Sequence, residues 1–204
     1  QYMQRPAPIG GGIFKDAWWQ YYSALPEIES RNIYADTAQK TKEQNDFSVF
    51  QCWGKGVNGN LYLIDMIRGK WEAPELIKRA QAFWSKHKAM TGCGPLRRMK
   101  IEDKSSGTGL IQTLKKESRI PVTAIPRSID KVTRALDATP HIECGRVYLP
   151  NDAPFVSDIL SESAAFPNAA HDDTLDPLMD AVSDNFNSGT NMSDLLKLAT
   201  GANR

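Results

Sequence analysis

The chain has 204 residues, of which 41% are hydrophobic and 24% charged, with 14 Gly and 12 Pro. This composition fits one globular domain, or one domain with arms, and excludes the collagenous, fibrous and disordered classes. Because the formal net charge is only +1, no overall field attracts polyanions, and any nucleic-acid site must come from local segregation of charge.

Membrane and secretory features are absent from the sequence. No apolar run approaches the roughly 18 to 20 residues of a membrane helix, and the first residues lack the apolar stretch of a signal peptide. The three cysteines, Cys52, Cys93 and Cys144, are odd in number and widely spaced, which argues against a disulfide framework or a cysteine metal knuckle. We therefore expect an intracellular protein with no membrane partner.

The two ends of the chain differ from its middle. Residues 1–28 are expected to form an arm or linker that docks through its aromatic residues, Trp18, Trp19, Tyr21 and Tyr22. Residues 189–204 are expected to form a tail with one short apolar helix pattern around Leu195. The predicted domain therefore spans residues 29–188.

Three β-rich runs open this domain, at residues 31–36, 47–55 and 61–68. The turn-forming residues 56–60 join the second run to the third, which predicts an antiparallel meander. Pro74 then suits a first helical turn, and apolar residues at helical spacing predict a helix of roughly four turns.

Strands and helices alternate through the rest of the domain. We predict strands at 98–102, 120–125 and 146–149, and helices at 109–117, 129–138, 153–165 and 174–186. Such alternation implies right-handed crossovers and parallel neighbours. The prediction is an α/β fold, with a mixed central sheet of five or six strands and helices on both faces.

Acidic residues fall at the ends of these elements. Asp36 closes the first strand, Glu102 and Asp103 follow the fourth, and His171-Asp172-Asp173 precede the last helix. If the first and fourth strands are neighbours, these carboxylates meet and need a positive partner, for which Mg²⁺ or Mn²⁺ is suited. Two such ions would activate a water and stabilise a leaving phosphodiester oxygen. Taken singly, each acid is equally explained as a helix cap, a loop residue or a solvated charge.

Four motifs in this order are similar to those of a known family: Asp36-Thr37-Ala38, residues 45–49, residues 101–107, and His171-Asp172-Asp173. From about residue 13 to 186 the chain resembles the C-terminal nuclease domain of the large terminase subunit of tailed bacteriophages. The resemblance implies a ribonuclease H-like fold, whose first three strands form a meander and whose next two are parallel. It also implies a metal-dependent endonuclease that cuts concatemeric viral DNA in the host cytoplasm.

The same resemblance assigns the site. Asp36, Glu102 and Asp173 match the catalytic, metal-binding acids, and the adjoining Asp103 and Asp172 are alternative metal ligands. Around them we expect Lys104, Asp46 as an outer ligand or a strand start, and His171 as an orienting or proton-moving group or a structural residue. The family's last motif often continues Asp-Ala, whereas this chain has Asp176-Pro177. Because Pro suits only a first helical turn, the helix should begin near Leu175 or Asp176, and Asp176 is left out of the predicted set.

Basic residues cluster near the acidic strand ends and are expected to contact double-stranded DNA; those assigned to it are Arg98, Lys100, Arg127, Lys131 and Arg134. Residues 105–109 either offer backbone N–H groups to a phosphate or form a helix cap. No base-reading motif is visible, so we expect phosphate contacts and little sequence preference. By the resemblance, specificity comes from the small terminase subunit and the portal.

The chain lacks a GxxxxGK[ST] motif, so it is not by itself an ATP-driven motor. The resemblance implies that its partner is an ATPase domain of the same polypeptide, joined through residues 1–28. Two alternatives stay open. One is another ribonuclease H-like nuclease, of the resolvase or integrase type. The other is a non-catalytic module that docks on DNA or protein, which metal-dependent cleavage would exclude.

Overall fold

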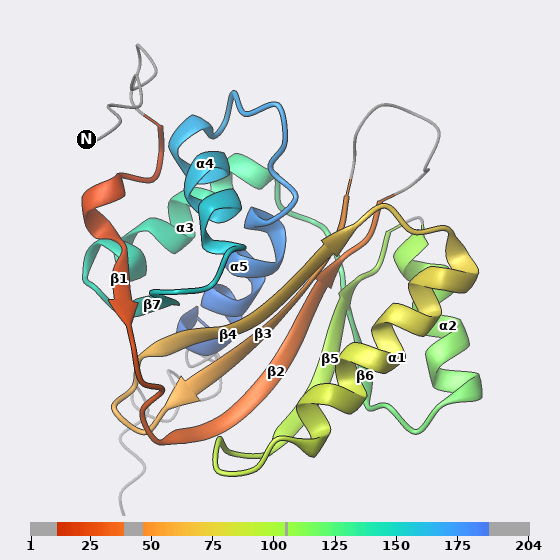
Figure 1. Cartoon of the computed structure of the whole chain (residues 1–204). Coiled ribbons are helices and arrows are strands. Elements are labelled where there is room, and N and C mark those ends of the chain that lie inside the picture. Colours follow the sequence, from red (N-terminus) through yellow and green to blue (C-terminus); the bar gives the residue numbers. More distant parts are fainter. Residues whose placement is uncertain (1–11, 39–46, 105, 188–204) are drawn as a thin grey trace, which may run out of the picture.

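The computed structural model describes residues 12–38, 47–104 and 106–187, and in them one mixed sheet lies between two layers of helices (Figure 1). Seven strands pair in the order β1-β7-β4-β3-β2-β5-β6. They are β1 Gln20–Tyr22, β2 Ile28–Asp36, β3 Ser48–Gly56, β4 Leu61–Gly69, β5 Leu96–Glu102, β6 Val122–Ile125 and β7 Val147–Pro150. The helices are α1 Ala73–Ala89, α2 Ser106–Glu117, α3 Lys131–Glu143, α4 Val156–Ala165 and α5 Leu175–Val182.

The predicted strand topology is confirmed. Strands β2, β3 and β4 form the antiparallel meander, while β5 lies parallel to β2 and β6 parallel to β5. The predicted number of strands is wrong by at least one. The additional strand, β1, comes from the segment expected to be an arm and pairs in parallel with β7 at one edge of the sheet.

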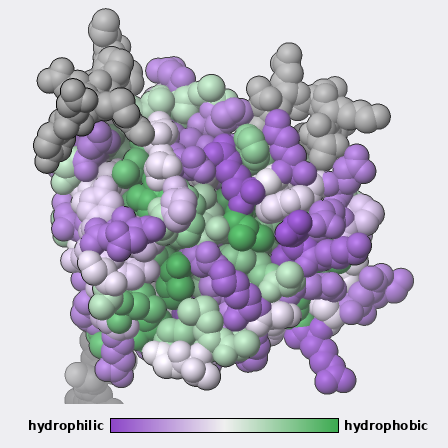
Figure 2. All heavy atoms as spheres, in the orientation of Figure 1, coloured by the Kyte–Doolittle hydropathy of each residue, from purple (hydrophilic) through white to green (hydrophobic). Residues whose placement is uncertain are grey.

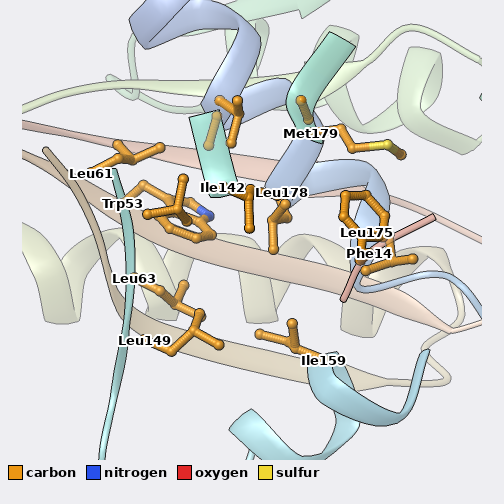
Figure 3. Packing of buried hydrophobic residues seen from close by; sticks show 14 of the residues in the cluster. Phe14, Trp53, Leu61, Leu63, Ile142, Leu149, Ile159, Leu175, Leu178 and Met179 are labelled. Atoms are coloured by element: carbon orange, nitrogen blue, oxygen red, sulfur yellow. The ribbon is translucent and has the colours of Figure 1, made fainter. Parts of the chain in front are cut away.

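Each face of the sheet carries its own apolar cluster, because successive strand residues point to opposite faces. One cluster joins α1 and α2 to the sheet, with Phe50, Phe83 and Leu114 buried between them. The other joins α3, α4 and α5 to the opposite face. Figure 3 shows two residues of α5 in this second cluster, Leu178 next to Ile142 and Leu175 next to Phe14.

The aromatic N-terminal segment docks on the second cluster, as expected. Phe14 and Trp19 are buried there, and the Phe14 ring lies 6.1 Å from the ring of Phe166. Tyr21, in β1, is exposed.

Two helices end differently from the predictions. Helix α3 runs through Pro140 to Glu143 instead of ending at Ala138. The missing N–H of Pro140 leaves the carbonyl of Leu136 without its usual donor, and the hydroxyl of Thr139 donates to that carbonyl at 2.8 Å. Helix α5 begins at Leu175 as predicted, but it continues beyond Val182 as one π-helical turn, Ser183–Asn187.

Several predictions concern segments outside the described residues. They are Asp46, Ser105, the first 11 residues of the expected arm, and the expected tail 189–204. Within the part that is described, no helix is both long and apolar enough to cross a membrane.

Candidate active site

The ends of β2 and β5 bring two acidic residues together. Ala35 pairs with Ile101 in the parallel ladder, so Asp36 and Glu102 occupy the next matching positions. Both line a cavity of about 370 Å³ at this end of the sheet. The sequence-based expectation that these two strand-end acids meet is therefore met by the geometry.

The environment of Asp36 disfavours its ionised form. Burial raises the pKa of Asp36 well above its usual range, and the nearby carboxylates of Asp176 and Glu102 raise it further. A hydrogen bond with Glu102 acts in the same direction, while Lys131 opposes the shift. The positive charge of Lys131 is therefore too weak at Asp36 to offset burial and the neighbouring carboxylates.

Helix α5 supplies a third carboxylate to the cavity, that of Asp176. Its Oδ2 lies 2.5 Å from the Lys131 ammonium, and its Oδ1 accepts from the Arg134 guanidinium. Burial raises the pKa of Asp176, but Lys131 and Arg134 outweigh burial and hold it below its usual value. The pKa values of these neighbouring acids therefore shift in opposite directions, because the cations contact only Asp176 directly.

Arg127, which follows β6, links the strand acids to α5. Its Nε lies 3.0 Å from Glu102 Oε1, and its Nη1 donates to Asp180 Oδ1 at 2.6 Å. Although burial opposes it, hydrogen bonding to Asp180 and Glu102 raises the pKa of Arg127 above its usual value. This guanidinium therefore holds the position of Glu102 relative to the last helix.

Buried hydrogen bonds fix where α5 begins. The backbone N–H and the hydroxyl of Thr174 both donate to Glu162 Oε2, at 2.9 and 2.6 Å. The carbonyl of Thr174 accepts from Gln51 Nε2 at 2.8 Å. Because Glu162 lies on α4 and Gln51 on β3, two separate elements hold the first residue before α5.

Three acids form a row along α5 and the π-helical turn that continues it. Asp176, Asp180 and Asp184 are four residues apart, and such residues share a helix face. Asp184 accepts from the Tyr34 hydroxyl at 2.6 Å and from the Lys100 ammonium at 2.5 Å. Lys100, predicted to contact DNA, is thus already paired inside the domain.

Other predicted ligands lie away from the Asp36–Glu102 pair. Asp173 Oδ2 lies 3.4 Å from Arg68 Nη2, and Asp173 does not line the cavity. Asp103 is exposed and accepts from the hydroxyl of Thr108 in α2 at 2.7 Å. Asp172 is linked to the cavity through a cation, because its Oδ1 lies 2.7 Å from the Lys131 ammonium, which also pairs with Asp176.

The predicted basic and outer residues separate into two groups. Four of them line the cavity: Lys104, Arg127, Lys131 and Arg134. Arg98 is exposed near the start of β5, four residues before Glu102. His171 packs its ring edge-on against Phe47 and has its Nδ1 4.0 Å from Asp173 Oδ2.

The sequence prediction omitted Asp176 and Asp180 from the site. Both are 7% exposed, inside a helix whose other buried residues are mostly apolar. Two acids four residues apart on the buried face of an apolar helix require polar partners. This spacing is the feature of the sequence from which the two residues could have been predicted to belong to the site.

The donor chemistry of the cavity suits a hard divalent cation. Carboxylate oxygens are the ligands that Mg²⁺ and Mn²⁺ prefer, and the Asp36 carboxyl, unlike those of Glu102 and Asp176, makes no ion pair among the described residues. Among the described residues, however, no three His, Cys, Asp or Glu side chains stand close enough together to hold a metal. Arg127, Lys131 and Arg134 take up the remaining carboxylates instead. The expected pair of ions therefore stays a prediction.

A family model described as the terminase RNaseH-like domain matches residues 33–184. The fold is similar to that of the large terminase nuclease from thermophilic phage G20c with bound magnesium, with a TM-score of 0.63 and 17% identity over 86% of this chain and 98% of that one. It is also similar to the human cytomegalovirus terminase nuclease domain, Mn soaked and inhibitor bound, with a TM-score of 0.62 and 12% identity over 83% and 93% of the two chains.

The large terminase of another thermophilic bacteriophage gives a TM-score of 0.61 and 12% identity over 84% of this chain. The match covers 43% of that protein, so the present chain corresponds to less than half of its length. No curated protein matches the sequence.

Proposed function

The chain belongs to the terminase RNaseH-like domain family, and from this premise we propose that it is a divalent-metal-dependent endonuclease acting on double-stranded DNA. The observation that carries the proposal is the contact between the Asp36 and Glu102 carboxyls at the ends of two parallel strands, in a cavity shared with Asp176. Carboxylates crowded in this way favour a hard cation over ordinary structural roles.

The residues of the cavity divide into two roles. Asp36, Glu102 and Asp176 are the proposed ligands of Mg²⁺ or Mn²⁺, which when bound supplies an activated water and stabilises the leaving oxygen of a phosphodiester. Lys104 is exposed at the mouth of the cavity and Lys131 lies inside it, where ammonium groups attract a phosphate backbone. Arg127 holds Glu102 in position through the pairs described above.

The biological substrate follows from the family. We propose that the substrate is concatemeric viral DNA cut during genome packaging in the host cytoplasm. The proposed partners are an ATPase domain of the same polypeptide, the small terminase subunit and the portal. The match to less than half of a phage large terminase supports a second functional part beyond this domain.

A cleavage assay tests the proposal. The 204-residue chain is incubated with supercoiled plasmid in EDTA, Mg²⁺ or Mn²⁺, beside Asp36→Asn, which keeps the side-chain shape and removes the charge. The control is Asp152→Asn, which removes one exposed carboxylate outside the cavity. We expect metal-dependent nicking and linearisation in the wild type and the control, reduced at least about a hundredfold in Asp36→Asn, in keeping with the several kcal/mol of transition-state stabilisation that metal-ion catalysis supplies.

Two outcomes would contradict the proposal. One is the absence of cleavage by folded wild-type protein with either metal, which would favour a non-catalytic docking module. The other is cleavage by Asp36→Asn at the wild-type rate, which would place the chemistry elsewhere.

A further inference from the structure

A larger cavity, of about 760 Å³, lies at the other end of β5 from the acidic residues. The C-terminal half of α1, the start of β5 and the connection between α2 and β6 enclose it. It is lined by Gln81, Trp84, Ser85, Lys88, Pro95, Leu96, Arg97, Ser118, Arg119, Ile120 and Pro121. We refer to this cavity as the basic groove. Its Leu96 and the Glu102 of the acidic cavity are the first and last residues of β5, which places them roughly 20 Å apart along the strand at about 3.3 Å per residue.

The charge of the basic groove is of one sign. Lys88, Arg97 and Arg119 are exposed, and no acidic residue lines the groove. Within the described ranges, none of these three side chains has a hydrogen-bond or ion-pair partner. By contrast, Arg127, Lys131 and Arg134 of the acidic cavity are all paired with carboxylates. The three groove cations therefore carry uncompensated charge.

Further cations surround the groove. Lys115 and Lys116 are exposed in the last turn of α2, where Glu117 is also exposed, and Arg98 is exposed beside Arg97 on β5. Figure 2 shows hydrophilic side chains over the right side of the molecule, where α1 and α2 lie in Figure 1. A chain with a net charge of only +1 thus concentrates positive charge on one part of its surface.

We propose that the basic groove binds the phosphodiester backbone of double-stranded DNA outside the segment that is cut; the identity of this ligand rests on the function proposed above. Arg, Lys, Ser and Gln side chains, which line the groove, are those that commonly contact DNA phosphates. Because Lys88, Arg97 and Arg119 are unpaired within the described part of the chain, binding DNA breaks no internal ion pair there. The groove adds affinity for DNA without taking part in the chemistry.

A DNA backbone fits this surface better than an acidic amphipathic peptide. Such a peptide would need an accessible apolar floor, but Trp84 is only 8% exposed and Leu96 only 5% exposed. The groove presents apolar surface as well, at Pro95, Ile120 and Pro121, but every charged side chain that lines it is a cation. This favours a hydrophilic polyanion.

The test measures DNA binding without cleavage. Fluorescence anisotropy of a labelled duplex is followed in EDTA over a range of salt concentrations, with the 204-residue chain and the triple variant Lys88→Ala/Arg97→Ala/Arg119→Ala. The matched control, Lys15→Ala/Lys55→Ala/Lys78→Ala, removes the same charge outside the groove. Thermal unfolding checks that each variant is folded.

We expect the groove variant to lose about tenfold or more in affinity at low salt. The slope of log K against log salt concentration should fall by up to about 3, since each phosphate contact contributes about 0.9. With Mg²⁺ and saturating DNA, its cleavage rate should stay within about twofold of the wild type, because the groove lies far from the reacting atoms.

Equal affinity and salt slope in the groove and control variants would overturn the inference, as would a wild-type chain that binds no DNA in EDTA. Binding of polyglutamate that depends on Lys88, Arg97 and Arg119, without an effect on DNA, would assign the groove to an acidic protein instead. Because the binding assay contains no metal, its result is independent of whether the chain cleaves DNA.

Discussion

At the scale of single residues, the site is a balance between crowded carboxylates and three cations. Asp36 and Asp176 share one cavity, yet the pKa of Asp36 is raised and that of Asp176 lowered. Burial acts on both, but only Asp176 has Lys131 and Arg134 in direct contact. The position of a cation, not burial alone, decides which carboxylate ionises readily.

Replacing Asp36 by Asn should therefore stabilise the metal-free protein at neutral pH. Folded Asp36 holds its proton more tightly than the unfolded chain does, so the folded state loses stability as pH rises above the ordinary carboxyl pKa of about 3.9. Asn carries no charge to be ionised. In EDTA at pH 7, Asp36→Asn should unfold a few degrees above the wild type, since about 1 kcal/mol corresponds to roughly 2–4 °C in a domain of this size.

The difference between the two melting temperatures should shrink as the pH falls toward about 4. Calorimetry across this range measures it, with Asp152→Asn as the charge-matched control because its carboxylate is exposed. A variant less stable than the wild type at pH 7, or a difference independent of pH, would contradict the assignment of Asp36 to a crowded carboxyl pair.

Two acids of the cavity, Asp36 and Glu102, were predicted from the sequence, whereas Asp176 was not. Asp36 and Glu102 end apolar strands, and strand ends follow from local patterns together with the parallel pairing of β2 and β5. Whether Asp176 faces the cavity depends on where α5 begins. Two hydrogen bonds fix that start: Gln51 donates to the carbonyl of Thr174, and the backbone N–H of Thr174 donates to Glu162. Those bonds join residues far apart in the sequence, and no local pattern contains them.

At the scale of elements, the N-terminal aromatic segment is part of the sheet. Strand β1 has only three residues, too few to show a period of two, and its partner β7 lies in the second half of the chain. The meander β2–β4 was predictable because its strands are long, apolar and adjacent in sequence. The edge strand was not, because its pairing is non-local.

Replacing Trp19 by Ala should lower the free energy of unfolding by about 3–5 kcal/mol, because truncating a buried Trp loses apolar burial and leaves a cavity. Trp19 is 4% exposed and contacts the cluster under α3, α4 and α5. Urea denaturation measures the loss, with Tyr21→Ala as the control on the same segment because Tyr21 is 43% exposed. Equal stabilities for the two variants would show that the segment does not contribute to the core.

At the scale of the whole molecule, the two cavities along β5 differ in their balance of charge: carboxylates and cations together line the acidic cavity, whereas cations alone are the charged residues of the basic groove. The acidic cavity lies at the last residues of β2 and β5, and the basic groove lies at the first residues of β5. A near-neutral net charge conceals this division. We propose that the residues at the acidic end of the sheet cut DNA and that those at the basic end bind it. Acidic residues of α5 connect the residues at the acidic end through their ion pairs with Arg127, Lys131 and Arg134.

The most direct measurement is a crystal structure of the wild-type chain soaked in Mn²⁺, with the metal located by its anomalous scattering. We expect Mn²⁺ between the carboxylates of Asp36 and Glu102, with Asp176 as a further ligand in place of its contact with Lys131. Mn²⁺ bound at Asp172 and Asp173 instead, or no Mn²⁺ at this cavity in protein that cleaves DNA, would contradict it.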